Sequence, residues 1–196
     1  MKRSFDIAVS LLLILFLMPL LAVIWSAVRM SLGDPVFFRQ TRPGLDGKPF
    51  EMIKFRSMTQ ARNQDGTDRP DADRLLPFGR FLRSTSLDEL PELWNVLKGD
   101  MSLVGPRPLL MAYIPLYNDT QKRRHEVRPG ITGWAQISGR NTLGWNERFE
   151  ADVWYVDNRS FWLDLKILWR TILIVIRRKG ISSASDATMA PFKGNN

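Results

Sequence analysis

The chain contains no cysteine and only one histidine, His125, among its 196 residues. The lack of cysteine excludes a disulfide framework and any thiolate metal site. A single histidine excludes a histidine-rich metal site and any mechanism that needs two imidazoles. Acidic residues are fewer than basic ones: the chain has 20 Asp and Glu and 28 Lys and Arg, which gives a formal net charge of +8. This excess favours an anionic partner: nucleic acid, phospholipid or a phosphorylated small molecule.

The N-terminal region contains a long run without charge. Residues 7–28, IAVSLLLILFLMPLLAVIWSAV, would form a helix about 33 Å long, enough to cross the hydrocarbon core of a bilayer. Lys2 and Arg3 precede the run and Arg29 follows it, so both ends prefer the cytoplasm under the positive-inside rule. Pro19 bends such a helix. Two arrangements fit, a helix that bends and returns to the same face or a single span with a kink, and both predict a membrane-bound protein.

The segment after the apolar run has the pattern of a β-hairpin. Residues 34–40, DPVFFRQ, and 49–58, PFEMIKFRSM, alternate in polarity. Between them, residues 41–48, TRPGLDGK, supply glycine and Asp-Gly for a turn. Residues 59–73 are polar, contain glycine and proline and lack apolar periodicity, which predicts a surface loop.

Three further segments predict helices or a tail. Residues 88–99, DELPELWNVLKG, have one apolar stripe and predict a short helix that ends at Lys-Gly. Residues 146–180 predict two helices, and the second carries Trp162 and Trp169 on a largely apolar surface. An interfacial membrane helix fits this pattern, and the alternative is a core helix of the globular domain. The last 16 or so residues are polar and predict a loosely held tail.

These patterns together predict a mixed, helix-rich α/β protein that is bound to the membrane. We expect residues 1–31 to form the membrane helix, in either of the two arrangements given above. Residues 32–180 would form a small cytoplasmic domain with a β-hairpin and interfacial amphipathic helices. Residues 181–196 would form the polar tail.

Asp88 and Glu89 stand side by side in the stretch STSLDELPEL. One interpretation is helix capping, because Ser86 and Glu89 match a capping box and acids are common in a first helical turn. For the pair in isolation, capping is favoured. The chemical interpretation is that an aspartate near arginines keeps its ionised form and attacks phosphorus. Its neighbour would then hold Mg²⁺, which completes its coordination with phosphates and water.

Several basic residues near the acids lie on rigid Pro/Gly frames. Arg107 is held between two prolines, Arg128 precedes Pro-Gly, and Arg140 follows a glycine. Such frames suit a grip on phosphate oxygens in fixed geometry. For each residue the alternative is a solvated surface or a lipid-headgroup contact. The candidate phosphate ligands are Arg83, Arg107, Arg128 and Arg140, and the family resemblance described next adds Lys54 as a weaker candidate.

The longer motifs resemble a known family. KRSFDIAVS, RPGLDGKPFEMIKFRSM, RSTSLDELPELWNVLKGDMSLVGPRPLL, RHEVRPGITGWAQISGRN and DVWYVDNRSFWLDLKIL cover nearly the whole chain. In this order they resemble the bacterial sugar transferases, the small monotopic phosphoglycosyl transferases, in their minimal form. Among these, the chain is most similar to members that use bacillosamine-type sugars in protein glycosylation.

The resemblance implies a reaction and its residues. Asp88 would attack the β-phosphate of a UDP-sugar and release UMP, which leaves a covalent aspartyl-phosphosugar. Undecaprenyl (polyprenol) phosphate would then take the phosphosugar and so initiate glycoconjugate assembly. Glu89, together with Asp88, would bind Mg²⁺, and the basic residues named above would bind substrate phosphate. The expected donor is N-acetylated, with UDP-N,N'-diacetylbacillosamine as the narrower expectation.

The resemblance also implies a place in the cell. The family's N-terminal helix is re-entrant and broken near its middle, and its domain lies on the cytoplasmic face of the bacterial inner membrane. The resemblance therefore implies that this chain is monotopic and that residues 1–31 form a re-entrant membrane helix. The break in the family often carries Ser-Pro, whereas this chain has Met18-Pro19. The missing hydroxyl removes one partner for the backbone groups that proline frees. Membrane phospholipid is an expected partner, and later glycan-assembly enzymes are candidates.

Two other functions fit parts of the sequence. A metal-dependent glycosyltransferase that acts on a lipid acceptor would release UDP instead of UMP. A nucleic-acid binder is suggested by charge alone. Since the aromatic residues cluster in apolar helices and do not alternate with basic residues on a strand, a stacking platform is missing and we expect no nucleic-acid partner.

Overall fold

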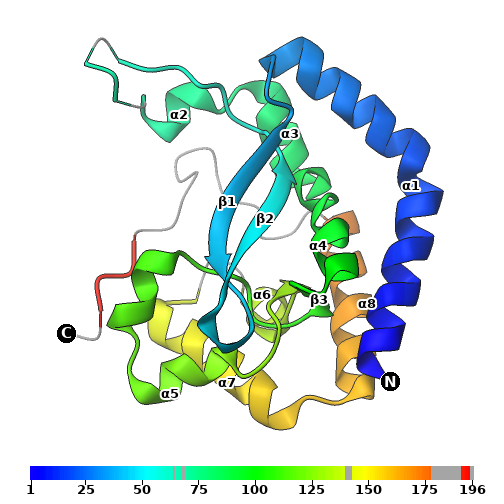
Figure 1. Ribbon diagram of the computed structural model, residues 1–196, viewed down its shortest axis with the longest axis vertical. Helices are drawn as coiled ribbons and strands as arrows, with labels where there is room; N and C mark the ends of the chain where they lie inside the picture. The colour runs from blue at the N-terminus through cyan, green and yellow to red at the C-terminus, as the bar shows by residue number, and fades with distance from the viewer. Residues whose placement is uncertain (64, 68, 140–142, 178–190, 195–196) are drawn as a thin grey trace.

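A computed structural model describes residues 1–63, 65–67, 69–139, 143–177 and 191–194. A long N-terminal helix, α1 (Lys2–Leu32), runs along one side of a small domain, and a β-hairpin lies along the front (Figure 1). Arg140 and most of the predicted tail lie outside the described residues.

Helix α1 is one element of 31 residues with Pro19 inside it. The predicted break at Met18-Pro19 is not present: the helix continues through both residues, and its axis curves, as Figure 1 shows. Proline removes one hydrogen bond and bends a helix without ending it when the neighbouring turns are strongly apolar. By length and composition α1 could cross a membrane.

Both ends of α1 are bound to the same domain. Near its start, the buried carboxylate of Asp6 accepts a hydrogen bond from Ser102 Oγ at 2.8 Å. At its end, Arg56 donates to the carbonyl oxygen of Gly33 at 2.5 Å and so caps the last turn. Between these anchors, residues 11–20 are mostly exposed. Much of the apolar middle of α1 is therefore not covered by the domain.

The predicted hairpin is confirmed. Strand β1 (Phe37–Pro43) pairs antiparallel with β2 (Pro49–Phe55), and Phe37 lies opposite Phe55. The turn between them contains the 3₁₀ segment η1 (Leu45–Gly47). Asp46 there has φ 55°, in the left-handed region that aspartate tolerates better than most residues.

The rest of the domain is built from short helices around a small parallel sheet. Strand β3 (Ser102–Val104) pairs with β4 (Gly130–Thr132). Helix α4 (Glu92–Lys98) lies between β2 and α1 and packs against both (Figure 1). The remaining elements are α2 (Asp71–Arg74), α3 (Pro77–Ser84), η2 (Leu87–Glu89), η3 (Met111–Leu116), α5 (Asp119–Lys122), η4 (Arg123–His125), α6 (Trp134–Ser138), α7 (Trp145–Asn158) and α8 (Phe161–Arg177).

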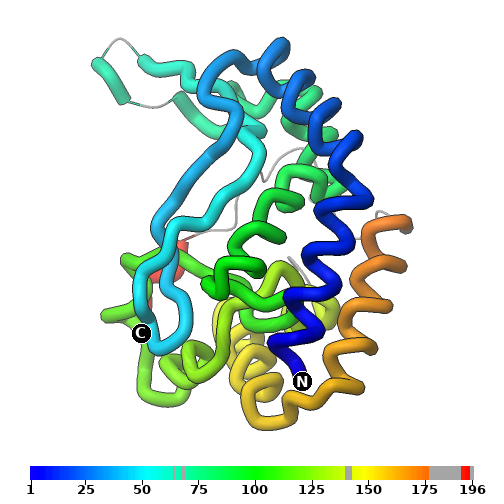
Figure 2. The backbone as a smooth tube through the Cα atoms, turned by 45° about the vertical axis from the view of Figure 1, so that its right-hand side comes forward, coloured from blue at the N-terminus to red at the C-terminus, as the bar shows by residue number. Residues whose placement is uncertain are grey.

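Helix α8 combines the two interpretations that its sequence allowed. Ile167 is fully buried in the main core, so one face of α8 packs into the domain, as the core-helix interpretation predicts. Trp162 and Trp169 are 78% and 62% exposed, so the other face presents aromatic side chains to the surroundings. Figure 2 shows α8 beside the N-terminal part of α1, where Lys2 Nζ lies 2.6 Å from Asp164 Oδ2. The two helices with exposed apolar side chains are therefore neighbours in the fold.

The predicted loose tail is wrong at Phe192. This side chain is buried in an aromatic cluster with Tyr113, Tyr117, Trp145 and Phe149. Its backbone N–H donates to the hydroxyl oxygen of Tyr113 at 3.2 Å. One aromatic residue in a polar segment is enough to anchor it, because a buried aromatic ring contributes a large apolar area.

Candidate functional site

The acid pair lies on a single turn between two helices. Ser86, just before η2, adopts a left-handed conformation with φ 56°. Pro91 then precedes the first residue of α4. Within the described chain, neither Ser86 nor Pro91 caps its helix through a side chain. The capping-box interpretation of Ser86 and Glu89 is therefore wrong, and the carboxylates are available for other contacts.

Glu89 is held by two cations that come from different elements. Its Oε1 accepts from Lys54 Nζ of β2 at 2.8 Å and from Arg107 Nη2, in the turn after β3, at 2.6 Å. Burial alone would raise the pKa of Glu89, but the charges of Arg107 and Lys54 outweigh it and hold this pKa well below its usual range. Glu89 is therefore anionic throughout the physiological range.

Asp88 has a different environment. Its side chain is 8% exposed and forms no hydrogen bond or ion pair with any described residue. Burial, reinforced by the charge of Glu89, raises the pKa of Asp88 to about 6. Lys54, Arg83 and Arg107 lower it, but by less. The arginines favour the ionised form of Asp88, as predicted, but burial and Glu89 outweigh their effect on the pKa. A carboxyl with a pKa of about 6 is still about nine-tenths ionised at pH 7.

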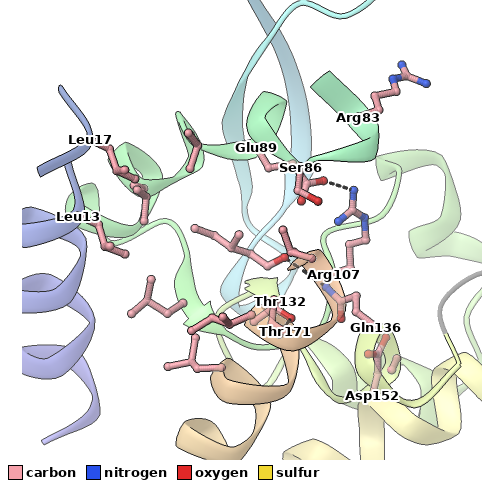
Figure 3. A pocket seen from close by; sticks show the side chains of 18 of the residues that line it. Leu13, Leu17, Arg83, Ser86, Glu89, Arg107, Thr132, Gln136, Asp152 and Thr171 are labelled. Carbon is pink, nitrogen blue, oxygen red and sulfur yellow. Dashed lines mark hydrogen bonds and ion pairs between the residues drawn. The ribbon is translucent and has the colours of Figure 1, made fainter. Parts of the chain in front are cut away.

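A cavity of about 580 Å³ opens beside the acid pair (Figure 3). One end is polar, and the other end is formed by apolar side chains of α1 and α8. The polar lining consists of Arg83, Ser86, Glu89, Arg107, Thr132, Gln136, Arg148, Asp152 and Thr171. The apolar end includes Leu13, Leu17, Leu168, Ile172 and Val175. Asp88 and Lys54 are not among the lining residues, but the neighbours Ser86 and Glu89 are.

The predicted phosphate ligands separate into three groups. Lys54 and Arg107 meet at Glu89. Arg83 lines the cavity, but its Nε donates to Ser57 Oγ at 2.9 Å and Figure 3 shows its guanidinium pointing away from Arg107. Arg128 donates to the carbonyl of Gly99 at 2.9 Å, where it caps the C-terminal end of α4. The structure thus places Arg128 at the opposite end of α4 from the acid pair.

The acid pair fits a magnesium ion only with help from substrate. The described residues contain no group of three or more His, Asp or Glu side chains that could hold a metal. Glu89 Oε1 is occupied by two cations, whereas its Oε2 and the Asp88 carboxylate have no partner in the described part of the chain. Mg²⁺ commonly uses one or two carboxylates and completes its shell with phosphates and water. The donor set is compatible with that pattern.

Comparison with known proteins identifies the family. Residues 1–178 match the family model described as bacterial sugar transferase. The chain belongs to the bacterial sugar transferase family. It is 53% identical over 195 residues to the uncharacterised sugar transferase EpsL of Bacillus subtilis strain 168, covering 100% of this chain and 96% of that relative. The resemblance to this family, predicted from the motifs, is confirmed, whereas the similarity to its bacillosamine-type members stays a prediction.

Longer members of the bacterial sugar transferase family carry names that specify a reaction. A Klebsiella pneumoniae UDP-glucose:undecaprenyl-phosphate glucose-1-phosphate transferase is 46% identical over 181 residues, 87% of this chain and 39% of the relative. An undecaprenyl-phosphate galactose phosphotransferase of Salmonella typhimurium is 39% identical over 197 residues, 92% of this chain and 41% of the relative. The chain therefore spans about two-fifths of these two relatives.

Sequence reasoning missed three charged residues at the site. Glu92 is 2% exposed, and its Oε1 lies 2.9 Å from Lys54 Nζ. Arg148 lines the cavity with its guanidinium 5.3 Å from the Trp145 ring centroid, and Asp152 lies one helical turn further along α7. The available signals were an acid within an apolar helix for Glu92 and an i, i+4 charge pair for Arg148 and Asp152.

Proposed function

We propose that this protein is a polyprenol-phosphate phosphoglycosyl transferase. It moves a sugar 1-phosphate from a UDP-sugar to undecaprenyl phosphate and releases UMP. The names of the Klebsiella and Salmonella relatives support this class of reaction. The observation that carries the proposal is a cavity with an acid–cation cluster at one end and membrane-type side chains at the other. Such a cavity suits one water-soluble substrate and one substrate confined to the bilayer.

The donor reacts at the polar end in two balanced steps. An oxygen of the Asp88 carboxylate attacks the β-phosphorus of the UDP-sugar, the bond from that phosphorus to the bridging oxygen breaks, and UMP leaves. A phosphate oxygen of undecaprenyl phosphate then attacks the same phosphorus, the aspartyl–phosphorus bond breaks, and the carboxylate is restored. Because Asp88 lies just behind the lining, its side chain must turn toward the cavity when the donor binds.

The neighbouring residues have supporting roles. Arg107 binds Glu89 with one nitrogen, and its side chain is 40% exposed at the cavity, so its remaining donors can bind phosphate oxygens. Arg148 lines the same end and adds positive charge near the pyrophosphate. Glu89 Oε2 and Asp88 would hold Mg²⁺, which would offset the repulsion between an anionic nucleophile and an anionic phosphate.

The arrangement of α1 supports a monotopic, re-entrant placement at the cytoplasmic face of the inner membrane. A helix of 31 residues is about 46 Å long, and a full span would place its ends on opposite sides of a hydrocarbon core about 30 Å thick. Both ends of α1 contact the same domain, through Asp6 and through the carbonyl of Gly33. The exposed middle would then enter one leaflet, together with Trp162 and Trp169 of α8.

The acceptor enters at the apolar end. Leu13 and Leu17 of α1 and Leu168 and Ile172 of α8 line the same cavity. Isoprenoid units would lie against these side chains, which places the lipid phosphate toward Arg107. Two classes of donor are candidates: the motifs favour an N-acetylated or bacillosamine-type donor for protein glycosylation, whereas the names of the two relatives specify glucose and galactose.

The experiment is a product analysis with a panel of donors. UDP-glucose, UDP-galactose, UDP-N-acetylglucosamine and UDP-N,N'-diacetylbacillosamine are each incubated with the detergent-purified protein and undecaprenyl phosphate. We expect one donor or a narrow set to give UMP and a lipid-linked sugar diphosphate. Release of UDP would establish a glycosyltransferase instead, and Asp88→Asn should release neither nucleotide.

A further inference from the structure

We propose that Glu92 is a positioning residue of this site, which holds the Lys54 ammonium between two carboxylates and so fixes Glu89 beside Asp88. This role deepens the proposed transferase function and rests on it. Glu92 does not line the cavity, so it does not touch substrate and acts through Lys54.

The supporting geometry is a continuous row of charges from the core to the cavity. Glu92 Oε1 lies 2.9 Å from Lys54 Nζ, Lys54 Nζ lies 2.8 Å from Glu89 Oε1, and that oxygen lies 2.6 Å from Arg107 Nη2. The exposed fractions of these four side chains rise along the row, from 2% and 13% to 18% and 40%. Contacts therefore link the buried end of α4 to the guanidinium at the cavity.

Stability alone does not account for a charge at this position. Glu92 lies at the start of α4 next to the core residues Leu93 and Val96. Replacing a buried ion pair by apolar residues of similar volume is often neutral or stabilising. Burial raises the pKa of Glu92 to about 7, so the folded environment disfavours its ionised form. A functional reason for keeping an acid here is therefore needed.

That reason lies in the freedom of a lysine side chain. Lys54 has a flexible four-carbon stem, and its ammonium is a point charge that can pair with any nearby anion. Without the negative charge of Glu92, the ammonium is free to move toward Asp88 or toward an incoming phosphate. Pairing with Asp88 would quench the nucleophile, and release of Glu89 would leave its carboxylate poorly oriented. The other charges that face Glu92 are Arg42 of β1, Glu89 of η2 and Arg107.

The test compares Glu92→Gln with a matched buried acid. Asp164→Asn is the control, because Asp164 is also a buried carboxylate paired with a lysine, Lys2, at 2.6 Å and away from the acid pair. We expect Glu92→Gln to lower kcat for UMP release about tenfold at pH 8, where Glu92 is mostly ionised and the substitution replaces its charge-assisted contact with Lys54 by a neutral one, with KM for the UDP-sugar within about twofold. Asp164→Asn should lower the melting temperature and leave kcat per folded protein unchanged.

A double-mutant cycle then asks whether Glu92 acts through Lys54. In a Lys54→Met background, Glu92→Gln should change kcat by less than about twofold, since the residue it positions is gone. If the double variant turns over too slowly to measure, the same cycle is read from the rate of covalent adduct formation with donor alone.

Three results would overturn the inference. The first is an unchanged kcat in Glu92→Gln. The second is an equal fold-loss of kcat in the wild-type and Lys54→Met backgrounds, and the third is a loss of kcat that parallels the fraction of unfolded protein. Failure of the wild-type protein to release UMP from any donor would instead remove the proposed function, so the two failures are distinguishable.

Discussion

The substitution Asp88→Asn should raise the free energy of unfolding even as it abolishes turnover. Asp88 is buried, lacks a hydrogen-bond partner among the described residues and stands next to a second carboxylate. Its ionised form therefore disfavours folding. The neutral amide has almost the same shape, and it removes the charge that both burial and Glu89 oppose.

The magnitude follows from the shift in pKa. Burial raises the pKa of Asp88 from 3.8 to about 6 on folding. At about 1.4 kcal/mol for each pKa unit, the ionised carboxylate costs up to about 3 kcal/mol of folding free energy above pH 7. This cost is absent below the unfolded-state pKa, develops as the pH rises through the interval from 3.8 to about 6, and is constant above it. The advantage of Asp88→Asn should follow the same course.

The assay is thermal unfolding of both proteins in the same detergent between pH 4.5 and pH 8. At about 2–4 °C for each kcal/mol in a chain of this size, we expect the variant to melt up to about 10 °C higher at pH 8, and we expect this difference to shrink toward pH 4.5. Asp164→Asn serves as the opposite case, because it breaks an ion pair and should melt lower than wild type. A variant that is less stable than wild type at pH 8, or a difference in melting temperature that does not change with pH, would show that burial does not raise the pKa of Asp88 on folding.

Three other predictions address the remaining parts of the site. Leu17→Gln should raise KM for undecaprenyl phosphate several-fold without slowing adduct formation from donor alone. The control is Leu12→Gln, which should change neither quantity, because Leu12 is 66% exposed on α1 and lies outside the cavity lining; equal effects of the two substitutions would indicate general membrane binding. Arg107→Lys keeps the charge but loses the guanidinium fork, so kcat/KM for the UDP-sugar should fall about tenfold, and retention of full activity would exclude a phosphate role. Arg124→Gln leaves the buried Asp152 carboxylate without its partner at 2.7 Å and should lower the free energy of unfolding by about 3–5 kcal/mol in denaturant titrations; a loss below about 1 kcal/mol would contradict this.

Local patterns were sufficient for much of the fold. Alternating polarity around Asp-Gly predicted the hairpin of β1 and β2, and the last two helices were predicted where α7 and α8 lie. These elements are specified by short-range turn chemistry and by periodicity. The long apolar run likewise predicted α1, although Pro19 curves it without breaking it.

The parts of the site that sequence reasoning missed depend on long-range contacts. Lys54 meets Glu89 and Glu92 across 35 and 38 positions of the chain, and no local pattern indicates this meeting. The pKa of Asp88 depends on burial, which overcomes the nearby cations. Arg128 lies in the Pro/Gly-rich turn that its sequence predicted, but its guanidinium binds the carbonyl oxygen of Gly99 at the C-terminal end of α4 and not the acid pair. A Pro/Gly frame indicates a fixed side chain without indicating its target.

The covalent intermediate can be detected in the intact mass of the purified protein after incubation with a UDP-sugar donor alone. With the donor that supports turnover, we expect a mass increase equal to one sugar phosphate, located on Asp88 by peptide mapping. This adduct should be lost when undecaprenyl phosphate is added and should never form on Asp88→Asn. Rapid UMP release in the presence of acceptor, with no adduct at any time when acceptor is withheld, would contradict this expectation.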